Sequence, residues 1–81
     1  VNQIEKFYLK LFPNPTDGIL NFSTSSNIEE LQILDLHGKI ILETNLNTNN
    51  GSIDLKNFNN GIYTVKAFSK TGVIHEKIIL H

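Results

Sequence analysis

Asp35 and His37 are the residues whose types and spacing come closest to those of a catalytic pair. Together with a serine they could supply the acid, base and nucleophile of a hydrolase. However, no serine stands in a Gly-x-Ser-x-Gly sequence, the local context that exposes such a nucleophile. His37 is also followed by Gly38, a pair typical of a tight turn. We therefore expect no catalytic residues, and no enzyme.

Two further groups of polar residues suggest chemistry only at first sight. Glu29 and Glu30 could act as an acid–base pair on a glycoside, but neighbours in an extended segment point to opposite faces. The alternating asparagines between residues 45 and 49 resemble a calcium-binding loop, but they are neutral amides, and Lys56 stands where such a loop needs a closing glutamate. The chain has no cysteine, and its three histidines lack ligand spacing. The sequence thus predicts no metal, no cofactor and no small-molecule substrate.

The composition favours one small folded module. The chain has 81 residues, enough for one domain and too few for a second core. Its net charge is −1 and its lysines are dispersed, so a nucleic-acid surface is disfavoured. No apolar run approaches the ~18 residues of a membrane-spanning helix. The chain starts at Val1 without a charged and apolar leader, so we expect it to be a piece of a longer protein.

Apolar residues recur at every second position, which is the period of β-strands. Polar stretches rich in Gly, Asn, Asp, Ser and Pro separate these runs. The pattern predicts an all-β domain, an antiparallel sandwich of seven short strands. We expect these strands at Phe7–Phe12, Ile19–Ser23, Glu30–Leu36, Lys39–Asn45, Ser52–Leu55, Ile62–Ser69 and Val73–Leu80.

The same alternation assigns one face of each strand to the core. The predicted core residues are Leu9, Leu11, Leu20, Phe22, Leu31, Ile33, Ile41, Ile53, Leu55, Tyr63, Val65, Ala67, Ile78 and Leu80. The opposite face should carry Phe12, Leu34, Ile40, Leu42, Ile62 and Phe68, so either the registers contain bulges or the surface has an apolar patch. Glu76 falls on the core side of the last strand, which indicates an edge position or a bulge.

Turn residues separate the predicted strands. The run Pro13–Gly18 contains two prolines and cannot continue a ladder, so the chain should reverse there in a stiff loop. Gly38, Gly61 and Gly72 can take the positive φ of tight turns. The asparagine-rich range 45–50 is expected to form a solvated loop, with a turn at the glycine that follows.

Four sequence elements occur in a specific order. The first reads Phe12-Pro13-Asn14-Pro15-Thr16-x-Gly18-x-Leu20-x-Phe22, and the second Leu31-x-Ile33-x-Asp35-x-x-Gly38-Lys39-x-Ile41. The third reads Ile53-Asp54-Leu55-x-x-Phe58-x-x-Gly61-x-Tyr63-x-Val65, and Lys77-Ile78-Ile79 follows near the end. In this order and spacing they resemble the type A C-terminal sorting domain of the bacterial type IX (Por) secretion system. The resemblance covers nearly the whole chain.

The resemblance implies a function and its partners. Such a domain has an immunoglobulin-like sandwich fold and ends a larger secreted adhesin or hydrolase of a Bacteroidetes-type bacterium. In the periplasm it is recognised by the outer-membrane translocation machinery, which exports the cargo to the cell surface or the medium. A sortase then typically removes the domain and anchors the cargo at the surface. We expect this chain to act in the same way.

The resemblance also carries over the family's sorting motif, residue by residue. The corresponding positions are Pro13, Asn14, Pro15, Gly18, Asp35, Gly38, Gly61, Tyr63, Lys77 and Ile78. Most of these have a sufficient structural role in turns or in the core. The terminal strand differs, because an exposed edge can pair with a strand of a receptor. The expected recognition surface consists of Lys77, Ile79, Leu80 and His81, with Phe12, Ile62 and Phe68 as a second candidate.

The sorting domain is expected to span residues 7–81, with Val1–Lys6 as the remnant of a linker. The alternative is an immunoglobulin-like accessory module that binds carbohydrate or acts as a spacer in an extracellular enzyme. Carbohydrate binding needs exposed aromatic platforms. This chain has no Trp and only two Tyr, of which Tyr63 is assigned to the core. The sorting domain is therefore the preferred prediction.

Overall fold

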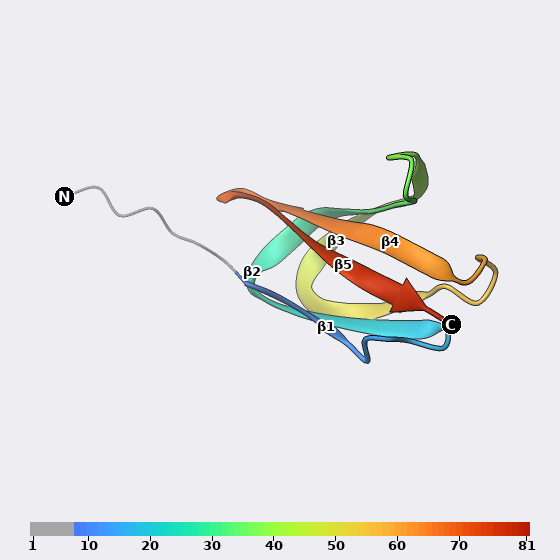
Figure 1. Ribbon diagram of the computed structural model, residues 1–81. Coiled ribbons are helices and arrows are strands. Elements are labelled where there is room, and N and C mark those ends of the chain that lie inside the picture. Colours follow the sequence, from blue (N-terminus) through green and yellow to red (C-terminus); the bar gives the residue numbers. More distant parts are fainter. Residues whose placement is uncertain (1–7) are drawn as a thin grey trace.

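The structure is a computed structural model that describes residues 8–81 as one antiparallel sheet of five strands (Figure 1). The strands are β1 (Leu9–Phe12), β2 (Ile19–Leu34), β3 (Ile40–Asp54), β4 (Gly61–Ser69) and β5 (Gly72–Leu80). The described residues contain no helix, and hence none that could cross a membrane. The all-β prediction is confirmed. The predicted linker Val1–Lys6, and Phe7 at the start of the first predicted strand, lie outside the described residues.

The prediction of seven strands is wrong, because two pairs of predicted strands each belong to one long strand. The segments predicted at 19–23 and 30–36 lie largely in β2, and those at 39–45 and 52–55 lie largely in β3. The β2–β3 register shifts between Ser23 and Ile28, and again between Ile28 and Glu30. Such bulges bend a strand without ending it. Polar side chains therefore predicted loops where the ladder bends but continues.

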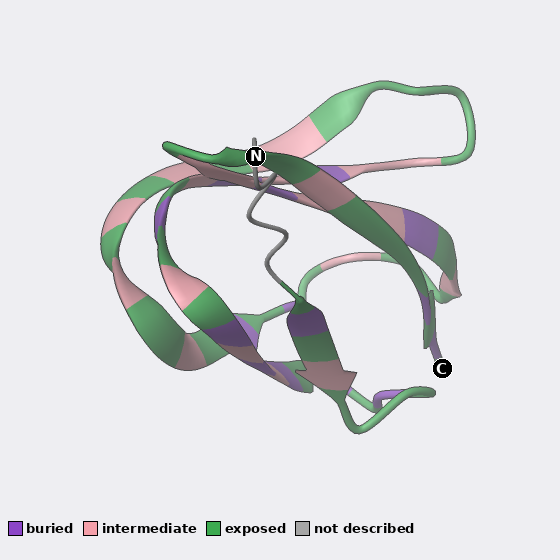
Figure 2. Ribbon diagram, turned by 90° about the vertical axis from the view of Figure 1, so that its left-hand side faces the viewer, coloured by how far each residue is buried: buried purple, intermediate pink, exposed green. Residues whose placement is uncertain are grey.

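The bend divides the sheet into two halves that face each other. The first part of β2 pairs with β1 and with the end of β3. The second part of β2 pairs with the start of β3 and with β4, and β5 follows as the outer strand. Viewed along the strands, the sheet curls almost into a ring, with the strand that leads to the C terminus facing β1 across the opening (Figure 2). The inner side chains of both halves form the core.

The predicted core is confirmed, with Leu11 and Ile41 partly buried against it. The sequence missed Ile28, which is fully buried at the bend although polar residues surround it in the chain. The prediction that Leu42 points outward is wrong, because the register places it opposite the buried Ile33. The exposed apolar residues that the alternation predicted include Phe12, Ile40 and Ile62.

The asparagine-rich range 45–50 is part of β3 rather than a solvated loop. Gly51 forms no turn there, because it lies opposite Phe22 in the β2–β3 ladder. A Cβ atom on Gly51 would lie 2.8 Å from Cζ of Phe22, much closer than packed carbon atoms approach. Gly51 therefore leaves space for the buried Phe22 ring.

The structure tests three predictions about turns and edges, those for Gly38, Gly61 and Glu76. Gly38 has a φ of 82° between β2 and β3, as predicted. Gly61 has no positive φ, so the prediction that it needs turn geometry is wrong; it begins β4 opposite Leu80. Glu76 is exposed in a regular β4–β5 register. The edge position, and not a bulge, thus gives its carboxylate access to water.

Candidate functional site

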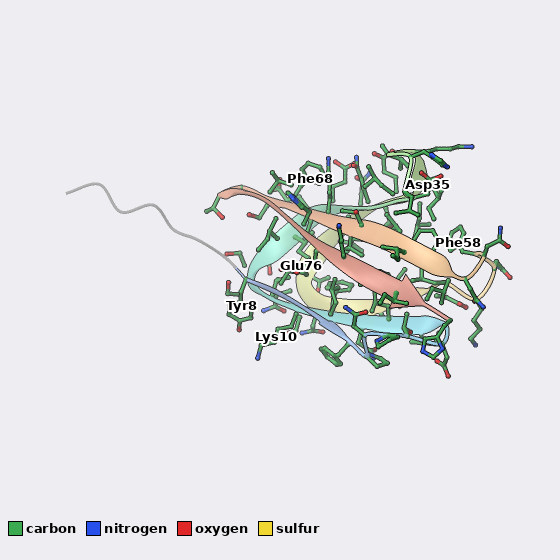
Figure 3. The ribbon with its side chains drawn as sticks, viewed as in Figure 1. Tyr8, Lys10, Asp35, Phe58, Phe68 and Glu76 are labelled. Carbon is green, nitrogen blue, oxygen red and sulfur yellow. The ribbon has the colours of Figure 1, made fainter. Side chains whose placement is uncertain are left out.

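Three connections and the chain end meet at one end of the molecule, which we call the motif end. It comprises the loop Pro13–Gly18, the turn Asp35–Lys39, the turn Leu55–Asn60 and the terminal segment Lys77–His81 (Figure 1). They gather because β2 and β3 both fold over at the bend, so that each of these two strands begins and ends at this end of the molecule. Figure 3 shows Asp35 and Phe58 at this end, whereas Tyr8 lies towards the other. The predicted sorting-motif residues lie here or in the adjoining parts of β4 and β5.

The side chain of Asn14 ties its loop to the end of β5. Its Nδ2 donates to the carbonyl of Lys77 at 3.1 Å, and its Oδ1 accepts from the N–H of Ile79 at 3.0 Å. These bonds join residues 63 and 65 positions apart in the chain. An amide supplies a donor and an acceptor together, as a backbone does. Asn14 therefore replaces the neighbouring strand that an edge strand lacks.

The backbone of Thr16 continues this pairing along β5. Its N–H donates to the carbonyl of Ile79 at 2.8 Å, and its carbonyl accepts from the N–H of His81 at 2.9 Å. The fully buried Thr16 hydroxyl donates to the Ile19 carbonyl at 2.7 Å and accepts from the Gly18 N–H at 3.2 Å. The loop thus bonds the end of β5 while its own buried polar groups are satisfied.

Gly18 joins the same loop to the turn after β3. Its φ is 155°, a backbone conformation that favours glycine, and its carbonyl accepts from the N–H of Leu55 at 2.7 Å. A Cβ atom there would lie 2.7 Å from Cγ of Lys56. Pro13 and Pro15 are exposed on this loop, each after a cis peptide bond. The turn role predicted for Gly18 is consistent with this geometry.

Asp35 caps the turn between β2 and β3. Its Oδ1 accepts from the N–H of His37 at 2.8 Å and from the N–H of Lys39 at 3.0 Å. The bond from Lys39 is the main reason that the pKa of Asp35 lies below its usual value of 3.8, and the N–H of His37 lowers it further. Asp35 thus meets the backbone of His37, whereas a catalytic triad needs the imidazole.

Tyr63 anchors the turn Leu55–Asn60 to the core. Its hydroxyl donates to the carbonyl of Asn59, and its ring centroid lies 6.4 Å from that of Phe58 at a tilt of 49°. Tyr63 also lies opposite Ile78 of β5. By contrast, a Cβ atom on Gly61 would meet no atom within 4 Å, so nothing in the structure explains a glycine at that motif position.

The predicted recognition residues near the chain end differ in accessibility. Lys77, Ile79 and His81 are exposed, and Ile79 retains 44% of its surface. Leu80 and Ile78 are buried in the core at 3% and 0% exposure. In the folded domain a receptor could therefore contact the side chains of Lys77, Ile79 and His81, but not those of the two buried residues.

The second candidate surface is not one patch. Phe12 lies on β1 opposite Asn21, in the other half of the sheet. Ile62 and Phe68 lie at the two ends of β4, with Ile62 opposite the exposed Ile79. Phe68 is only partly exposed. The structure therefore brings Ile62 to the terminal segment and leaves Phe12 and Phe68 apart from it.

A groove of about 520 Å³ lies on the outer face of β4 and β5, beside the turn Asp35–Lys39. Its lining includes three apolar side chains, those of Leu34, Leu36 and Ile62. It also includes the ammonium groups of Lys66 and Lys77 and the imidazole of His75. Sequence reasoning could not find this groove, because its residues come from three strands and a turn. Among residues 8–81, no three His, Asp or Glu side chains gather as metal ligands would.

The comparison with models of known protein families agrees with the sequence elements. The family model described as the secretion system C-terminal sorting domain matches residues 10–81. The match includes both the loop Pro13–Gly18 and the terminal segment to which it is bonded. The comparison with curated proteins gave no match. The chain belongs to the family of type IX secretion C-terminal sorting domains, and its function is to mark a cargo protein for export by that system.

Proposed function

We propose that the outer-membrane translocation machinery recognises this domain at the motif end, through the exposed side chains of Lys77 and Ile79. The domain is covalently part of a larger cargo protein. A sortase of the same system then removes the domain and anchors the cargo at the cell surface. The domain, which spans residues 7–81 after a linker at 1–6, contributes no catalysis of its own.

The hydrogen bonding between Asn14 and β5 carries this proposal. Through it, the loop near the start of the family match and the terminal segment form one connected surface. Four outward backbone groups of the terminal segment are bonded to the loop, which fixes the path of the chain end. A receptor that binds a fixed segment does not lose affinity by ordering a flexible one. The side chains of Lys77 and Ile79 are therefore suited to recognition.

An immunoglobulin-like arrangement of the two half-sheets is part of the proposal. Tyr63 supports it, because a tyrosine hydroxyl bonded to the backbone a few residues upstream is the tyrosine corner of immunoglobulin-type sandwiches. The likeness concerns how the halves face each other and not the number of strands. No observation on residues 8–81 favours the accessory-module alternative.

Export of a periplasmic reporter fused ahead of the domain tests the proposal, in a bacterium that has type IX secretion. The variant combines Lys77→Ser with Ile79→Ser. It keeps every backbone hydrogen bond of the terminal segment and leaves the buried Ile78 and Leu80 in place. We expect the reporter to remain in the periplasm, while the isolated domain melts at nearly the parent temperature.

The matched control combines Lys10→Ser with Tyr8→Ser. It likewise removes one lysine and one exposed apolar side chain, but in β1 and just before its start, where Tyr8 is 52% exposed. We expect this control to be exported like the parent. Equal loss of export in both variants, or normal export of the first, would show that the motif end is not the recognised surface.

A further inference from the structure

The outer edge of β5 has a bonded part and an open part. In an antiparallel ladder, alternate residues direct both backbone groups to the same side. The N–H and carbonyl of Ile79 face the loop and not β4. The backbone N–H and carbonyl groups of Lys77, His75 and Val73 therefore also point away from β4. The loop's bonds begin at the Lys77 carbonyl, and within residues 8–81 β4 is the only strand paired with β5. The outward groups of Val73 and His75 are thus open to pairing.

Basic side chains flank this open part on the outer face. His75 and Lys77 lie on β5 itself, and Lys66 lies opposite His75 on β4. The register places no carboxylate directly opposite these residues, and Glu30 is the diagonal neighbour of Lys66. Lys66 stands between His75 and Gln32 across the sheet, and Lys77 stands opposite Thr64.

The acidic residues of this region have other partners. Asp35 accepts two backbone N–H groups of its own turn. The carboxylates of Glu30 and Glu43 both accept from the Gln32 side-chain amide, at 3.1 Å and 2.7 Å. The charges of Lys66 and Lys77 are therefore available to a partner that brings carboxylates.

From the open edge and these charges, we infer that an extended segment of a partner protein, with carboxylates on one face, docks along Val73–Lys77 as an added strand. Its backbone pairs with Val73 and His75, and its acidic side chains lie beside His75 and Lys77 on the outer face. On the inner face it meets the exposed carboxylate of Glu76, which disfavours acidic side chains there. The inference rests on the proposed function, because the added strand belongs to the export machinery.

The loop Pro13–Gly18 determines where this docking ends. Asn14 and Thr16 already occupy the outward groups between the Lys77 carbonyl and the His81 N–H. An added strand cannot continue past Lys77 without displacing them. The sequence predicted an open edge at the chain end itself. In the structure the unpaired backbone groups lie before it, along Val73–Lys77, and only side chains are accessible at the chain end.

The purified, ¹⁵N-labelled chain and two short peptides test the inference. One peptide alternates Glu with Val, and the other alternates Lys with Val. We expect the Glu peptide to shift the amide signals of Val73, His75 and Lys77, and its binding to weaken as salt is added. We expect the Lys peptide to cause no such shifts, and the amide of Ile79, which Asn14 occupies, to stay unchanged with either peptide.

Three variants sharpen the result. His75→Pro removes an outward N–H, a change that edge strands tolerate, and should abolish binding of the Glu peptide while the domain still melts cooperatively. Lys66→Glu leaves the edge intact and should weaken that binding by about two- to fivefold, as for an exposed charge pair. Asn14→Ala should extend the shifted region to Ile79, because the backbone N–H of Ile79 then becomes free to pair.

Several outcomes would overturn the inference. These are equal binding of the Lys peptide, unchanged binding by a folded His75→Pro variant, and shifts confined to β1 or β3. Stronger binding to phosphatidylglycerol vesicles than to the Glu peptide would assign the basic residues to a lipid surface, and would also overturn it.

The export assay separates this inference from the proposed function. If Lys77→Ser with Ile79→Ser blocks export but His75→Pro and Lys66→Glu do not, the proposed function stands and the docked strand is wrong. If all three block export, both stand. If none does, the proposed function is wrong, and the peptide titration still decides whether the edge takes an acidic strand.

Discussion

The two ends of the sheet hold their connections in different ways. At the motif end, the side chain of Asn14 and the backbone of Thr16 replace missing strand partners and bond residues far apart in the chain. The opposite end, which we call the corner end, contains the β2–β3 bend and the β4–β5 hairpin tip. Its hydrogen bonds are local, as between Ser69 and Thr71, or join strands that are already ladder partners, as between Thr24 and Asn49.

The difference shows what each end contributes. Breaking a bond at the corner end removes one contact between segments that the ladder still holds together. Breaking a bond at the motif end separates the loop from the terminal segment, which no ladder joins apart from the single bridge between Thr16 and Leu80. We therefore expect substitutions that remove the hydrogen bonds of the loop Pro13–Gly18 to affect stability and export together, and the following predictions compare residues of the motif end in order of expected size.

Thr16→Val should have the largest effect on stability. It keeps the buried shape but leaves the Gly18 N–H and the Ile19 carbonyl without their partner. An unsatisfied buried group costs about 1–3 kcal/mol, so the free energy of unfolding measured by chemical denaturation should fall by that amount. Thr16→Ser, which keeps the hydroxyl, is the control and should retain most of the stability. Equal midpoints for valine and serine would mean that the loop does not depend on these bonds.

Asn14→Ala should have a smaller effect on stability and a marked one on the chain end. It removes two exposed hydrogen bonds, worth about 1 kcal/mol in total because water competes for them. Amide hydrogen exchange at Ile79 should become faster, while exchange at Ile78, which faces β4, changes little. Asn14→Asp keeps the acceptor for Ile79 but loses the donor to Lys77. Its exchange rate at Ile79 should therefore lie between those of the parent and of Asn14→Ala. Unchanged exchange at Ile79 would contradict the role given to Asn14.

Asp35→Asn should lower stability only above the acid range. Because the folded pKa of Asp35 is depressed, its carboxylate stabilises the turn above the unfolded pKa, and this contribution is lost as the pH falls through the lower folded value. The difference in melting temperature between parent and variant should therefore be present at neutral pH, begin to shrink near pH 4 and vanish only below the depressed folded pKa. A difference that persists undiminished in acid would assign the effect to side-chain shape instead.

Gly61→Ala should have the smallest effect on stability, within about 0.5 kcal/mol, because its Cβ meets no neighbour and its φ is not positive. The informative measurement is export of the reporter. Loss of export by a variant that melts like the parent would make Gly61 a point of receptor contact at the motif end. A large loss of stability would instead reveal a constraint on this residue that the structure does not show.

The sequence by itself determined most of the side chains that lie inside, although it missed Ile28 and Leu42. Alternation along a strand is a local property, so the buried positions of Leu20, Ile33 and Val65 follow from the period alone. The same pattern indicated an edge position or a bulge at Glu76, because a carboxylate on the core side needs water, and the structure has the edge position. The turn at Gly38 was also predictable, since its backbone angle depends on neighbouring residues only.

Only the tertiary structure decided the number of strands and the partners of the chain end. Whether a polar stretch such as 45–50 ends a strand depends on the ladder of β2 beside it, and the buried Ile28 holds the bend that keeps both strands continuous. Likewise, nothing local to Asn14 shows that its amide meets Lys77 and Ile79. Hydrogen bonds between distant segments form only after the sheet has curled, so their partners are set by the fold and not by the neighbouring residues.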